Sequence, residues 1–406
     1  MITFLKKIIP TDLFRWLQPI YHYKLALLGA LIYRFPSRQL YVIGVTGTKG
    51  KSSVVEMINA LLETAGRRTA AASTIRFKIG PASQRNLYKM TMPGRLVLQR
   101  FLRQAVTTSC THAIIEMTSE GARQFRHRFI DLDALIFTNL SPEHIESHGS
   151  VEKYLAAKLS LARALASSPK TNKLLIVNAD DAVSEKFVAT AGPKVKVIKF
   201  YPSRDNEQIA SPLPGDFNRA NWLAALALGR ELSVTNDATR AAIKKLTVIP
   251  GRVEEVVAQP FRVIVDYAHT VDSLTKLYQA FADQRKICVL GGTGGGRDRW
   301  KRPLMGQLAS AHCDRVIFTN EDPYDEDPVA IVAEVAAGAE RTNHETILDR
   351  RAAIARAITL AQPGDVVLIT GKGTDPYIMA AQGQKIPWDD VRVAREELTH
   401  ARTAGS

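Results

Sequence analysis

A short run of glycine, lysine and hydroxyl residues behind an apolar segment constrains the fold most. Residues 40–45 are expected to form a buried strand, and residues 52–65 show the apolar spacing of a helix. The run between them comprises Thr46, Gly47, Thr48, Lys49, Gly50, Lys51, Ser52 and Ser53. Glycines let backbone N–H groups close around phosphate oxygens, and the helix N-terminus adds a positive dipole. The run therefore predicts a variant phosphate-binding loop, since Val45 stands where the usual pattern has its first glycine.

Strand-like and helix-like segments alternate along the rest of the chain. Further buried strands are expected at residues 112–116, 134–138, 174–177, 262–265, 286–290, 315–318 and 365–369. Such alternation is typical of α/β proteins with mostly parallel sheets. We expect a central P-loop-type ATPase domain with a mostly parallel sheet, followed by a Rossmann-like C-terminal domain. The expected boundaries are a basic N-terminal segment at 1–40 and domains at 41–248 and 249–406, the last beginning at a Pro-Gly pair.

The charge balance indicates an anionic partner. Lysine and arginine number 54 against 40 aspartate and glutamate, a net charge of +14. Between Glu63 and Glu116 there is no acidic residue. Nine basic residues gather there: Arg67, Arg68, Arg76, Lys78, Arg85, Lys89, Arg95, Arg100 and Arg103. They form either a solvated basic face or a surface for an acidic substrate.

Composition excludes several classes of protein. With 46% hydrophobic and 23% charged residues, the chain is neither disordered, fibrous nor polytopic. Three scattered cysteines without a CxxC pair argue against a disulfide framework or a zinc site, and they favour a reducing cytoplasm. Residues 1–40 are basic and apolar but hold no run long enough to span a bilayer. We expect an amphipathic helix there that packs on the protein, with contact to a membrane surface as the alternative.

Polar residues follow two of the expected strands. Glu116 ends one strand, and Asn139 and His144 follow the next. Because ligands lie beyond the carboxyl ends of parallel strands, Glu116 and His144 could hold a metal ion beside the loop phosphates. Taken singly, Glu116 could instead cap a helix, and His144 could be an ordinary loop histidine.

Several longer motifs resemble the Mur ligase family, and within it the branch that adds the third amino acid of the peptidoglycan stem peptide. They are Asn139-Leu140-Ser141-Pro142-Glu143-His144, Tyr154-Leu155-Ala156-Ala157-Lys158, Asn218-Arg219-Ala220-Asn221, Pro250-Gly251-Arg252-Val253-Glu254, Asp266-Tyr267-Ala268-His269-Thr270, the run from Gly295 to Pro303, and Gly371-Lys372-Gly373. The resemblance covers residues 41–400 in order.

The resemblance implies an ATP-dependent amide ligase that works through an acyl phosphate. Its catalytic residues would be Lys51, Glu116, His144 and Lys158. Two Mg²⁺ sites would be formed by Ser52, Glu116, His144 and Lys158, with Lys158 carrying a CO₂-derived carbamate; without the resemblance, Lys158 would be a surface helix lysine. Besides the loop, ATP would contact Asn139, Asn218, Asn221, Arg252, Asp266 and His269.

The resemblance also implies substrate contacts and shows departures. Substrate-binding positions would be Thr91, Ser119, Arg126, Arg302, Asp322, Tyr324, Gly371 and Asp375. Family members carry a uridine-binding domain of roughly one hundred residues, a common domain size, where only 40 residues precede the first strand here. Tyr324 stands where diaminopimelate-adding enzymes have an arginine. Glu321, Asp322, Asp325, Glu326 and Asp327 surround it, and these carboxylates favour a distal ammonium such as that of lysine, or form a solvated acidic loop.

The expected partners are an anionic muramyl-peptide-like acceptor and a free amino acid, not nucleic acid, in the cytoplasm. The sequence does not predict the oligomeric state. Two alternatives remain: a ligase like folylpolyglutamate or cyanophycin synthetase on another acidic acceptor, and a nucleotide-binding relative without catalysis.

Overall fold

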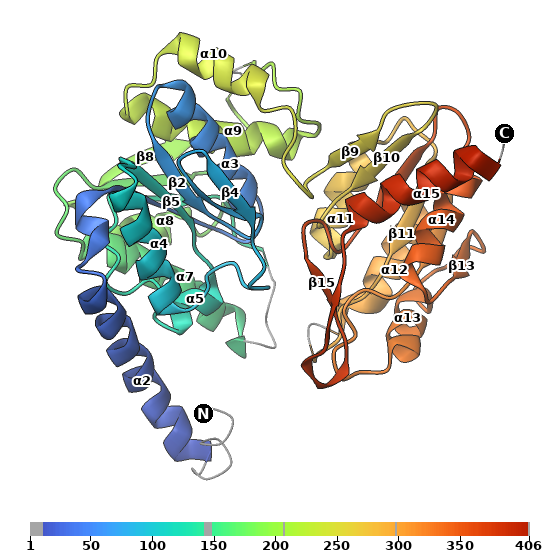
Figure 1. Cartoon of the computed structure of the whole chain (residues 1–406), viewed down its shortest axis with the longest axis horizontal. Helices are drawn as coiled ribbons and strands as arrows, with labels where there is room; N and C mark the ends of the chain where they lie inside the picture. Colours follow the sequence, from blue (N-terminus) through green and yellow to red (C-terminus); the bar gives the residue numbers. More distant parts are fainter. Residues whose placement is uncertain (1–10, 142–147, 206–207, 297–298, 405–406) are drawn as a thin grey trace. The chain divides into compact units, whose positions relative to one another are not determined.

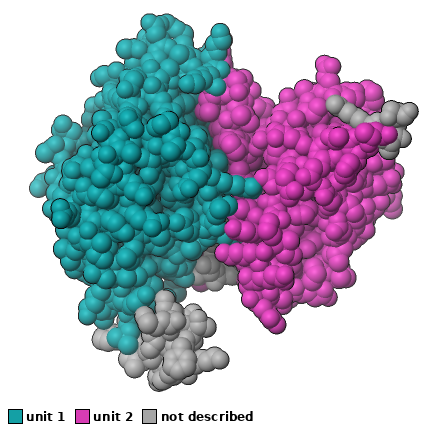
Figure 2. Space-filling model, viewed as in Figure 1, with its two compact units in different colours: residues 1–141, 150–209, 220–245 teal, residues 142–149, 210–219, 246–406 magenta. Residues whose placement is uncertain are grey.

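The computed structural model describes residues 11–141, 148–205, 208–296 and 299–404. They divide into two compact units, coloured separately in Figure 2. Unit 1 comprises residues 1–141, 150–209 and 220–245, and unit 2 comprises residues 142–149, 210–219 and 246–406. Within the described residues, no helix has the length and hydropathy of a membrane span.

Unit 1 is built on an eight-stranded sheet in the order β4-β3-β2-β5-β1-β6-β7-β8. The strands are β1 (Tyr41–Thr46), β2 (Thr69–Ala72), β3 (Arg76–Ile79), β4 (Ala82–Arg85), β5 (His112–Glu116), β6 (Ala134–Phe137), β7 (Leu174–Asn178) and β8 (Lys196–Phe200). Pairing is parallel except for the β2–β3 and β3–β4 pairs. The central strands are continuous apolar runs because helices cover both faces of such a sheet.

The helices that go with this sheet are α2 (Thr11–Ile32), α3 (Lys51–Thr64), α4 (Arg95–Thr107), α5 (Ser119–Arg123), α7 (Val151–Ala166), α8 (Ser184–Ala191) and α10 (Asn236–Lys245), with the 3-10 turn η1 (Pro36–Gln39). Helix α9 (Asp216–Glu231) begins in unit 2 and continues in unit 1. One core cluster lies between strands and helices and includes Leu98, Leu135, Leu161 and Phe187. Figure 1 shows these elements from blue to yellow-green.

Unit 2 is built on a six-stranded sheet in the order β13-β12-β11-β14-β10-β9, with a separate β15–β16 pair. Its strands are β9 (Glu254–Val257), β10 (Arg262–Val265), β11 (Lys286–Leu290), β12 (Arg315–Phe318), β13 (His344–Thr346), β14 (Val366–Ile369), β15 (Tyr377–Met379) and β16 (Lys385–Pro387). Its helices are α11 (Val271–Gln279), α12 (Lys301–His312), α13 (Pro328–Ala336), α14 (Arg350–Leu360) and α15 (Asp390–Ala404), with the short turn η2 (Ala381–Gly383). Two core clusters pack on this sheet.

The strand order sets where ligands bind. Strand β1 lies between β5 and β6, so the chain leaves β1 at a point where the connections turn to opposite sides of the sheet. In open α/β sheets, ligands bind outside the carboxyl ends of the strands at such a switch point. The loop after β1 and the residues that follow β5 and β6 meet there.

The expected strands are found at or within one residue of their predicted ends. Those at 112–116, 262–265, 286–290 and 315–318 match β5, β10, β11 and β12. The expectation about cysteines was wrong for one pair: Cys288 in β11 and Cys313 after α12 form a disulfide with their Cα atoms 6.3 Å apart. The two residues are 25 positions apart, and the packing of α12 on β11 and the pairing of β11 with β12 bring them together.

Candidate active site

The loop between β1 and α3 is folded around two glycines. Gly47 has φ +147°, and a Cβ there would lie 2.0 Å from Thr138 Oγ1. Gly50 has φ +82°, and a Cβ there would lie 2.2 Å from Asn221 Oδ1. Both positions therefore require glycine, for backbone conformation and for space. Asn221, expected at the nucleotide, packs directly against this loop.

Residues after β6 fix the shape of the loop. Asn139 accepts from the Thr48 and Lys49 backbone N–H groups, through its carbonyl and its side chain, each at 2.8 Å. Thr138 Oγ1 donates to the Lys49 carbonyl at 2.7 Å. The predicted loop and the predicted Asn139 are thus one hydrogen-bonded unit, which keeps the loop rigid before any phosphate arrives.

Lys51, Ser52 and Ser53 form the first turn of α3. Lys51 Nζ donates to the Thr48 carbonyl at 2.9 Å, so its ammonium is folded back over the loop. Ser52 and Ser53 are buried at the first turn of the helix. Thr46 is also buried, and its hydroxyl has no hydrogen-bond partner within the described residues.

Glu116 connects the loop to residues after β2. Its Oε2 atom accepts from Ser52 Oγ at 2.9 Å, from the Thr74 backbone at 2.8 Å and from the Thr74 hydroxyl at 3.0 Å. Thr74 in turn shares a 2.7 Å hydrogen bond with Thr91. Glu116 is therefore not a helix cap but a buried carboxylate aimed at the phosphate loop. Hydroxyl and carboxylate oxygens are the donors that Mg²⁺ prefers, so the pair of Ser52 and Glu116 fits that ion.

Lys158 lies on α7 and is buried, not on the surface. Its Nζ donates to the Gly47 carbonyl at 2.6 Å and lies 4.8 Å from the centre of the Tyr154 ring. Tyr154 shares a 3.0 Å hydrogen bond with Thr48. Ser150 caps the N-terminus of α7 by accepting from the Lys153 backbone, which fixes where the helix begins. His144, the other expected metal ligand, lies outside the described residues.

Of the expected acceptor residues, Arg126 contacts the segment that holds Thr91. Ser119 begins α5 and is buried. Arg126 donates to the Met92 carbonyl and, at 2.7 Å, to Gln124 Oε1. Burial lowers the pKa of Arg126, with Glu120 opposing the shift. Thr74 hydrogen-bonds both Thr91 and Glu116 and so connects these two expected residues. Thr74 itself was not among the residues expected from the sequence. Thr74 follows the end of β2, so the rule that selected Glu116 could also have selected it.

In unit 2, a second set of expected residues follows β10. Asp266 accepts from the Val253 and Ala268 backbone N–H groups at 2.7 and 2.6 Å. Burial raises the pKa of the Asp266 carboxyl, while Arg252 and these backbone groups oppose the shift. The Arg252 guanidinium lies 4.4 Å from the centre of the Tyr267 ring, and His269 contacts that ring edge-on. The Arg252–Tyr267 contact is a cation–π interaction, and it ties these expected nucleotide residues into one cluster.

Asn218, also expected at the nucleotide, lies in the first turn of α9. Its side chain donates to the Pro214 carbonyl at 2.8 Å at the start of α9 and is buried there. Asn218 thus contacts the backbone at the beginning of α9. Asn221, one turn later, packs against Gly50 of the phosphate loop.

The residues after β14 pack tightly against those before β9. Gly251 and Gly373 have φ +62° and +48°, and a Cβ on Gly251 would lie 2.5 Å from the Thr374 nitrogen. Gly371 has φ +102°, and a Cβ there would lie 2.4 Å from Glu321 Oε2. Glycine at these positions lets three loops meet at the carboxyl ends of the strands.

Lys372 is buried among these loops and bound by carboxylates. Its Nζ donates to Asp322 at 2.7 Å, to the Tyr377 carbonyl at 2.7 Å and to Asp375 at 3.4 Å. Asp322 also accepts from the Met379 backbone at 2.8 Å. The expected substrate residues Asp322 and Asp375 are thus engaged with Lys372. Asp322 and Glu321 are buried, which rules out a solvated loop for these two carboxylates.

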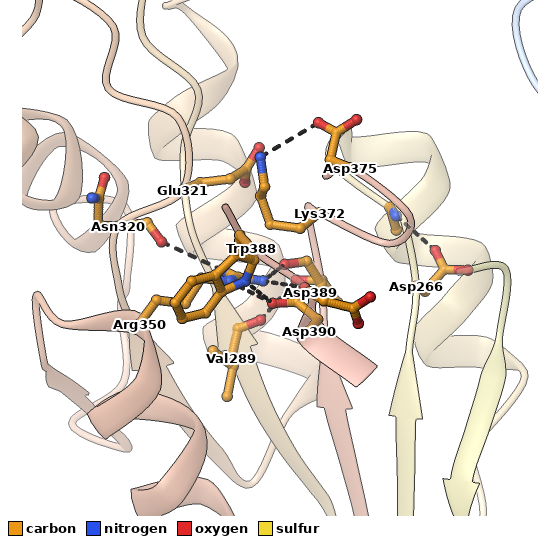
Figure 3. A network of polar contacts seen from close by, with 12 residues as sticks. Asp266, Val289, Asn320, Glu321, Arg350, Lys372, Asp375, Trp388, Asp389 and Asp390 are labelled. Atoms are coloured by element: carbon orange, nitrogen blue, oxygen red, sulfur yellow. Dashed lines mark hydrogen bonds and ion pairs between the residues drawn. The ribbon is translucent and has the colours of Figure 1, made fainter. Parts of the chain in front are cut away.

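A second buried pair supports the same loops. Arg350, at the start of α14, donates twice to Asp390, at 2.9 and 2.7 Å, and once to the Thr370 carbonyl at 2.7 Å. Trp388 donates to the same carboxylate at 2.7 Å, as Figure 3 shows beside Lys372. Burial alone would lower the pKa of Arg350, but the Asp390 carboxylate raises it above its usual range. This network fixes the strand end from which Gly371 and Lys372 follow.

The two carboxylate oxygens of Glu321 differ in their hydrogen bonding within the described residues. Thr293 donates to its Oε1 at 2.7 Å, while its buried Oε2 has no partner within the described residues. Tyr324, in the left-handed region at φ +53°, stacks on Gly295. Arg302 donates to Glu326 and Glu334 at 2.8 Å each, so two carboxylates already contact this expected α-carboxylate ligand.

The sequence matches two family models over these same regions. They are the Mur ligase middle domain over residues 45–207 and the Mur ligase glutamate ligase domain over residues 251–373. The UDP-N-acetylmuramyl-tripeptide synthetase of Roseiflexus sp. (strain RS-1) is 35% identical over 94% of this chain and 83% of its own length. The UDP-N-acetylmuramoyl-L-alanyl-D-glutamate–2,6-diaminopimelate ligase of Synechococcus elongatus is 36% identical over 93% and 80%.

Solved structures agree with the sequence matches. A UDP-N-acetylmuramoyl-L-alanyl-D-glutamate–2,6-diaminopimelate ligase aligns with a TM-score of 0.60 at 30% identity, covering 89% of this chain and 79% of that one. The folylpolyglutamate synthase of Mycobacterium tuberculosis aligns with a TM-score of 0.69 at 20% identity, covering 87% and 92%, and shares the fold. The chain therefore belongs to the Mur ligase family of ATP-dependent amide ligases.

Proposed function

We propose that this ligase joins an amino acid with a distal ammonium, such as L-lysine, to a muramyl-dipeptide-like acceptor in peptidoglycan precursor synthesis. The observation that carries the proposal is the grouping of Lys51, Ser52, Glu116 and Lys158 around one glycine loop. In this proposal residues 41–248 form the ATP-binding domain and residues 249–406 the amino-acid-binding domain. The requirement for ATP favours the cytoplasm.

The first step is attack of an acceptor carboxylate on the γ-phosphate of ATP. The loop N–H groups hold the phosphates, and Lys51 stabilises the charge that spreads over the transferring phosphoryl group. The acceptor oxygen bonds to phosphorus as the bond to ADP breaks, which leaves an acyl phosphate. Mg²⁺ would be held on one side by Ser52 and Glu116. It would lower the charge repulsion between the acceptor carboxylate and the phosphate oxygens.

Lys158 supports the second metal position in this scheme. The neutral Nζ can attack CO₂ and release a proton, which converts a cation into a carbamate that binds metal. The burial of Lys158 and its 2.6 Å contact with the loop favour this role over a surface role. His144 completes the proposed set from outside the described residues.

The second step is attack of the amino group of the incoming amino acid on the acyl phosphate. The amide bond forms, phosphate leaves and the amine loses a proton. Thr91, Ser119 and Arg126 are proposed to hold the acceptor, whose carboxylates match the basic stretch between residues 67 and 103. Six residues outside the loop are proposed to bind ATP: Asn139, Asn218, Asn221, Arg252, Asp266 and His269.

The side chain of the amino acid is proposed to meet Glu321. A buried carboxylate oxygen with no partner is costly, and an ammonium group would satisfy it with a charge-assisted hydrogen bond. Lys372 is committed to Asp322, so it does not replace the missing arginine for a distal carboxylate. Arg302 is proposed to bind the α-carboxylate, which would displace Glu326 or Glu334, and Gly371, Asp375 and Tyr324 are proposed to line the remaining wall.

Release of ADP tests the proposal. The enzyme is incubated with Mg²⁺, ATP and UDP-N-acetylmuramyl-dipeptide, with L-lysine, meso-diaminopimelate or no amino acid. We expect ADP only when acceptor and amino acid are both present, and a larger kcat/KM for lysine than for diaminopimelate. Amino-acid-independent ATP hydrolysis, or no ADP with any pair, would contradict the proposed function. Diaminopimelate carries a distal carboxylate beside its distal ammonium, so a preference for it would contradict the proposed selectivity for lysine but not the ligase reaction.

A further inference from the structure

Helix α2 carries an apolar face that stays exposed among the described residues of unit 1. Seven large apolar side chains on it are between 36% and 55% exposed. One of them, Tyr23, contacts the Phe129 ring edge-on. The other six are Leu17, Ile20, Tyr21, Leu28, Leu31 and Ile32. Their spacing of three, one, seven, three and one residues places them on a single side of a helix. We call these six residues the outer face of α2.

The opposite side of α2 is the one that packs on the protein. Ala26 and Ala30 are buried, and Gly29 lies so close to α4 that a Cβ would be 3.5 Å from Leu96 Cα. Arg103 on α4 donates to the Tyr33 carbonyl at 3.0 and 2.8 Å and so caps the C-terminal end of α2. The outer face is therefore turned away from unit 1 by a fixed contact. Figure 1 shows α2 projecting beyond the sheet and helices of this unit.

The charges along this segment are of one sign. Residues 17–40 contain Lys24, Arg34 and Arg38 and no aspartate or glutamate. Over residues 1–40 the sequence has six basic residues and one acidic residue. A helix with an apolar face and an excess of positive charge lies in the plane of a membrane interface and is attracted by anionic headgroups.

Lys24 distinguishes a lipid surface from a second copy of the chain. It is exposed and lies on the outer face between Tyr21 and Leu28. Pairing of two outer faces would bury this lysine in each copy, which costs free energy unless a carboxylate is provided. At a lipid surface its long side chain can instead reach the headgroups while its methylenes stay in the apolar layer. We propose that the outer face of α2 docks the enzyme on an anionic lipid surface, independently of its ligase reaction.

Sedimentation of the full-length protein with vesicles tests the proposal. One set of vesicles contains phosphatidylcholine alone and the other contains phosphatidylcholine with phosphatidylglycerol. We expect binding to the anionic set, weakened by salt above ~0.1 M because screening shortens the range of the attraction. The double variant Leu28→Glu/Leu31→Glu should bind ~10-fold or more weakly, since it removes apolar area and adds negative charge. Lys24→Glu should weaken binding by a smaller factor.

Val329→Glu is the matched control, because Val329 is an exposed apolar residue on α13 in the other unit. It should bind vesicles like the unmodified protein. All variants should keep the far-ultraviolet circular dichroism, the Tm and the ADP release of the unmodified protein, which separates failure of docking from failure of folding or of the ligase reaction. Equal sedimentation with both vesicle sets, or unchanged binding of the double variant, would overturn the proposal. So would self-association in ultracentrifugation that the double variant loses, without vesicle binding, because it would assign the outer face to a second copy.

Discussion

Two lysines at the phosphate loop of unit 1 and two buried cations of unit 2 have different hydrogen-bond partners. In unit 1, Lys51 and Lys158 donate to backbone carbonyls of the phosphate loop, at Thr48 and Gly47. In unit 2, Lys372 and Arg350 donate to carboxylates, at Asp322 and Asp390. A carbonyl oxygen positions a cation without neutralising its charge. A carboxylate positions the cation and also neutralises its charge.

This difference separates two roles that look alike in a sequence. The proposed roles of Lys51 and Lys158 are in the reaction, so we expect their removal to lower turnover. The two cations of unit 2 are parts of buried ion pairs, and we expect their removal to lower stability, because an uncompensated buried carboxylate remains.

Lys158→Ala should have the largest effect on activity. Turnover should fall by ~10³-fold or more, since the proposed metal-binding carbamate and its charge stabilisation are lost. ATP binding, measured by calorimetry, should persist, and bicarbonate or a short carboxylate should restore part of the rate. Lys153→Ala on the same helix is the control, because Lys153 is exposed. Near-normal turnover of Lys158→Ala would refute the carbamate role.

Arg350→Ala should have the largest effect on stability. Leaving Asp390 buried without its partner should cost about 3–5 kcal/mol of unfolding free energy, measured by urea denaturation. The control on the same helix is Arg356→Ala, whose ion pair with Glu345 is half-exposed and should be worth less than about 1 kcal/mol. If the two variants lose equal stability, the contrast between buried and exposed pairs does not hold here.

Lys51→Ala should lower the rate and leave stability nearly unchanged. The loss of a positioned cation should cost on the order of 3 kcal/mol of transition-state stabilisation. Steady-state kinetics and the Tm measured on the same preparation separate the two effects, with Lys186→Ala on α8 as an exposed lysine control. An unchanged rate would mean that the loop is structural only.

Glu321→Gln should have the smallest of these effects and should be selective. Replacing the carboxylate by an amide weakens a hydrogen bond to a charged group by about 1.5 kcal/mol, or roughly tenfold in kcat/KM for lysine. The KM for ATP should not change. Equal losses with lysine and with neutral amino acids would place Glu321 outside the side-chain pocket.

The sequence predicted the elements that depend on local pattern. The loop from Thr46 to Ser53, the strand before it and the polar residues after β5 and β6 follow from periodicity and from the rule for strand ends. These features carry their signal within a few residues, so they could be found without tertiary information.

What the sequence could not predict depends on long-range packing. The pairing of Lys372 with Asp322, 50 positions away, and that of Arg350 with Asp390, 40 away, require the strand order of unit 2. The same holds for the disulfide and for Thr74, whose importance comes from its contact with Glu116 across the sheet. Motif matching gave Asp322 and Arg302 substrate roles, but it could not show which carboxylates and cations already contact each other.

Oxygen transfer tests the central claim, that the loop of unit 1 moves the γ-phosphoryl group to an acceptor carboxylate. The acceptor is prepared with ¹⁸O in its reacting carboxylate and incubated with ATP, Mg²⁺ and L-lysine, and the released phosphate is analysed by mass spectrometry. Attack on the γ-phosphate followed by amide formation predicts one ¹⁸O atom in each phosphate released. Phosphate free of label, formed alongside the amide product, would show that no acyl phosphate is made and would contradict the account.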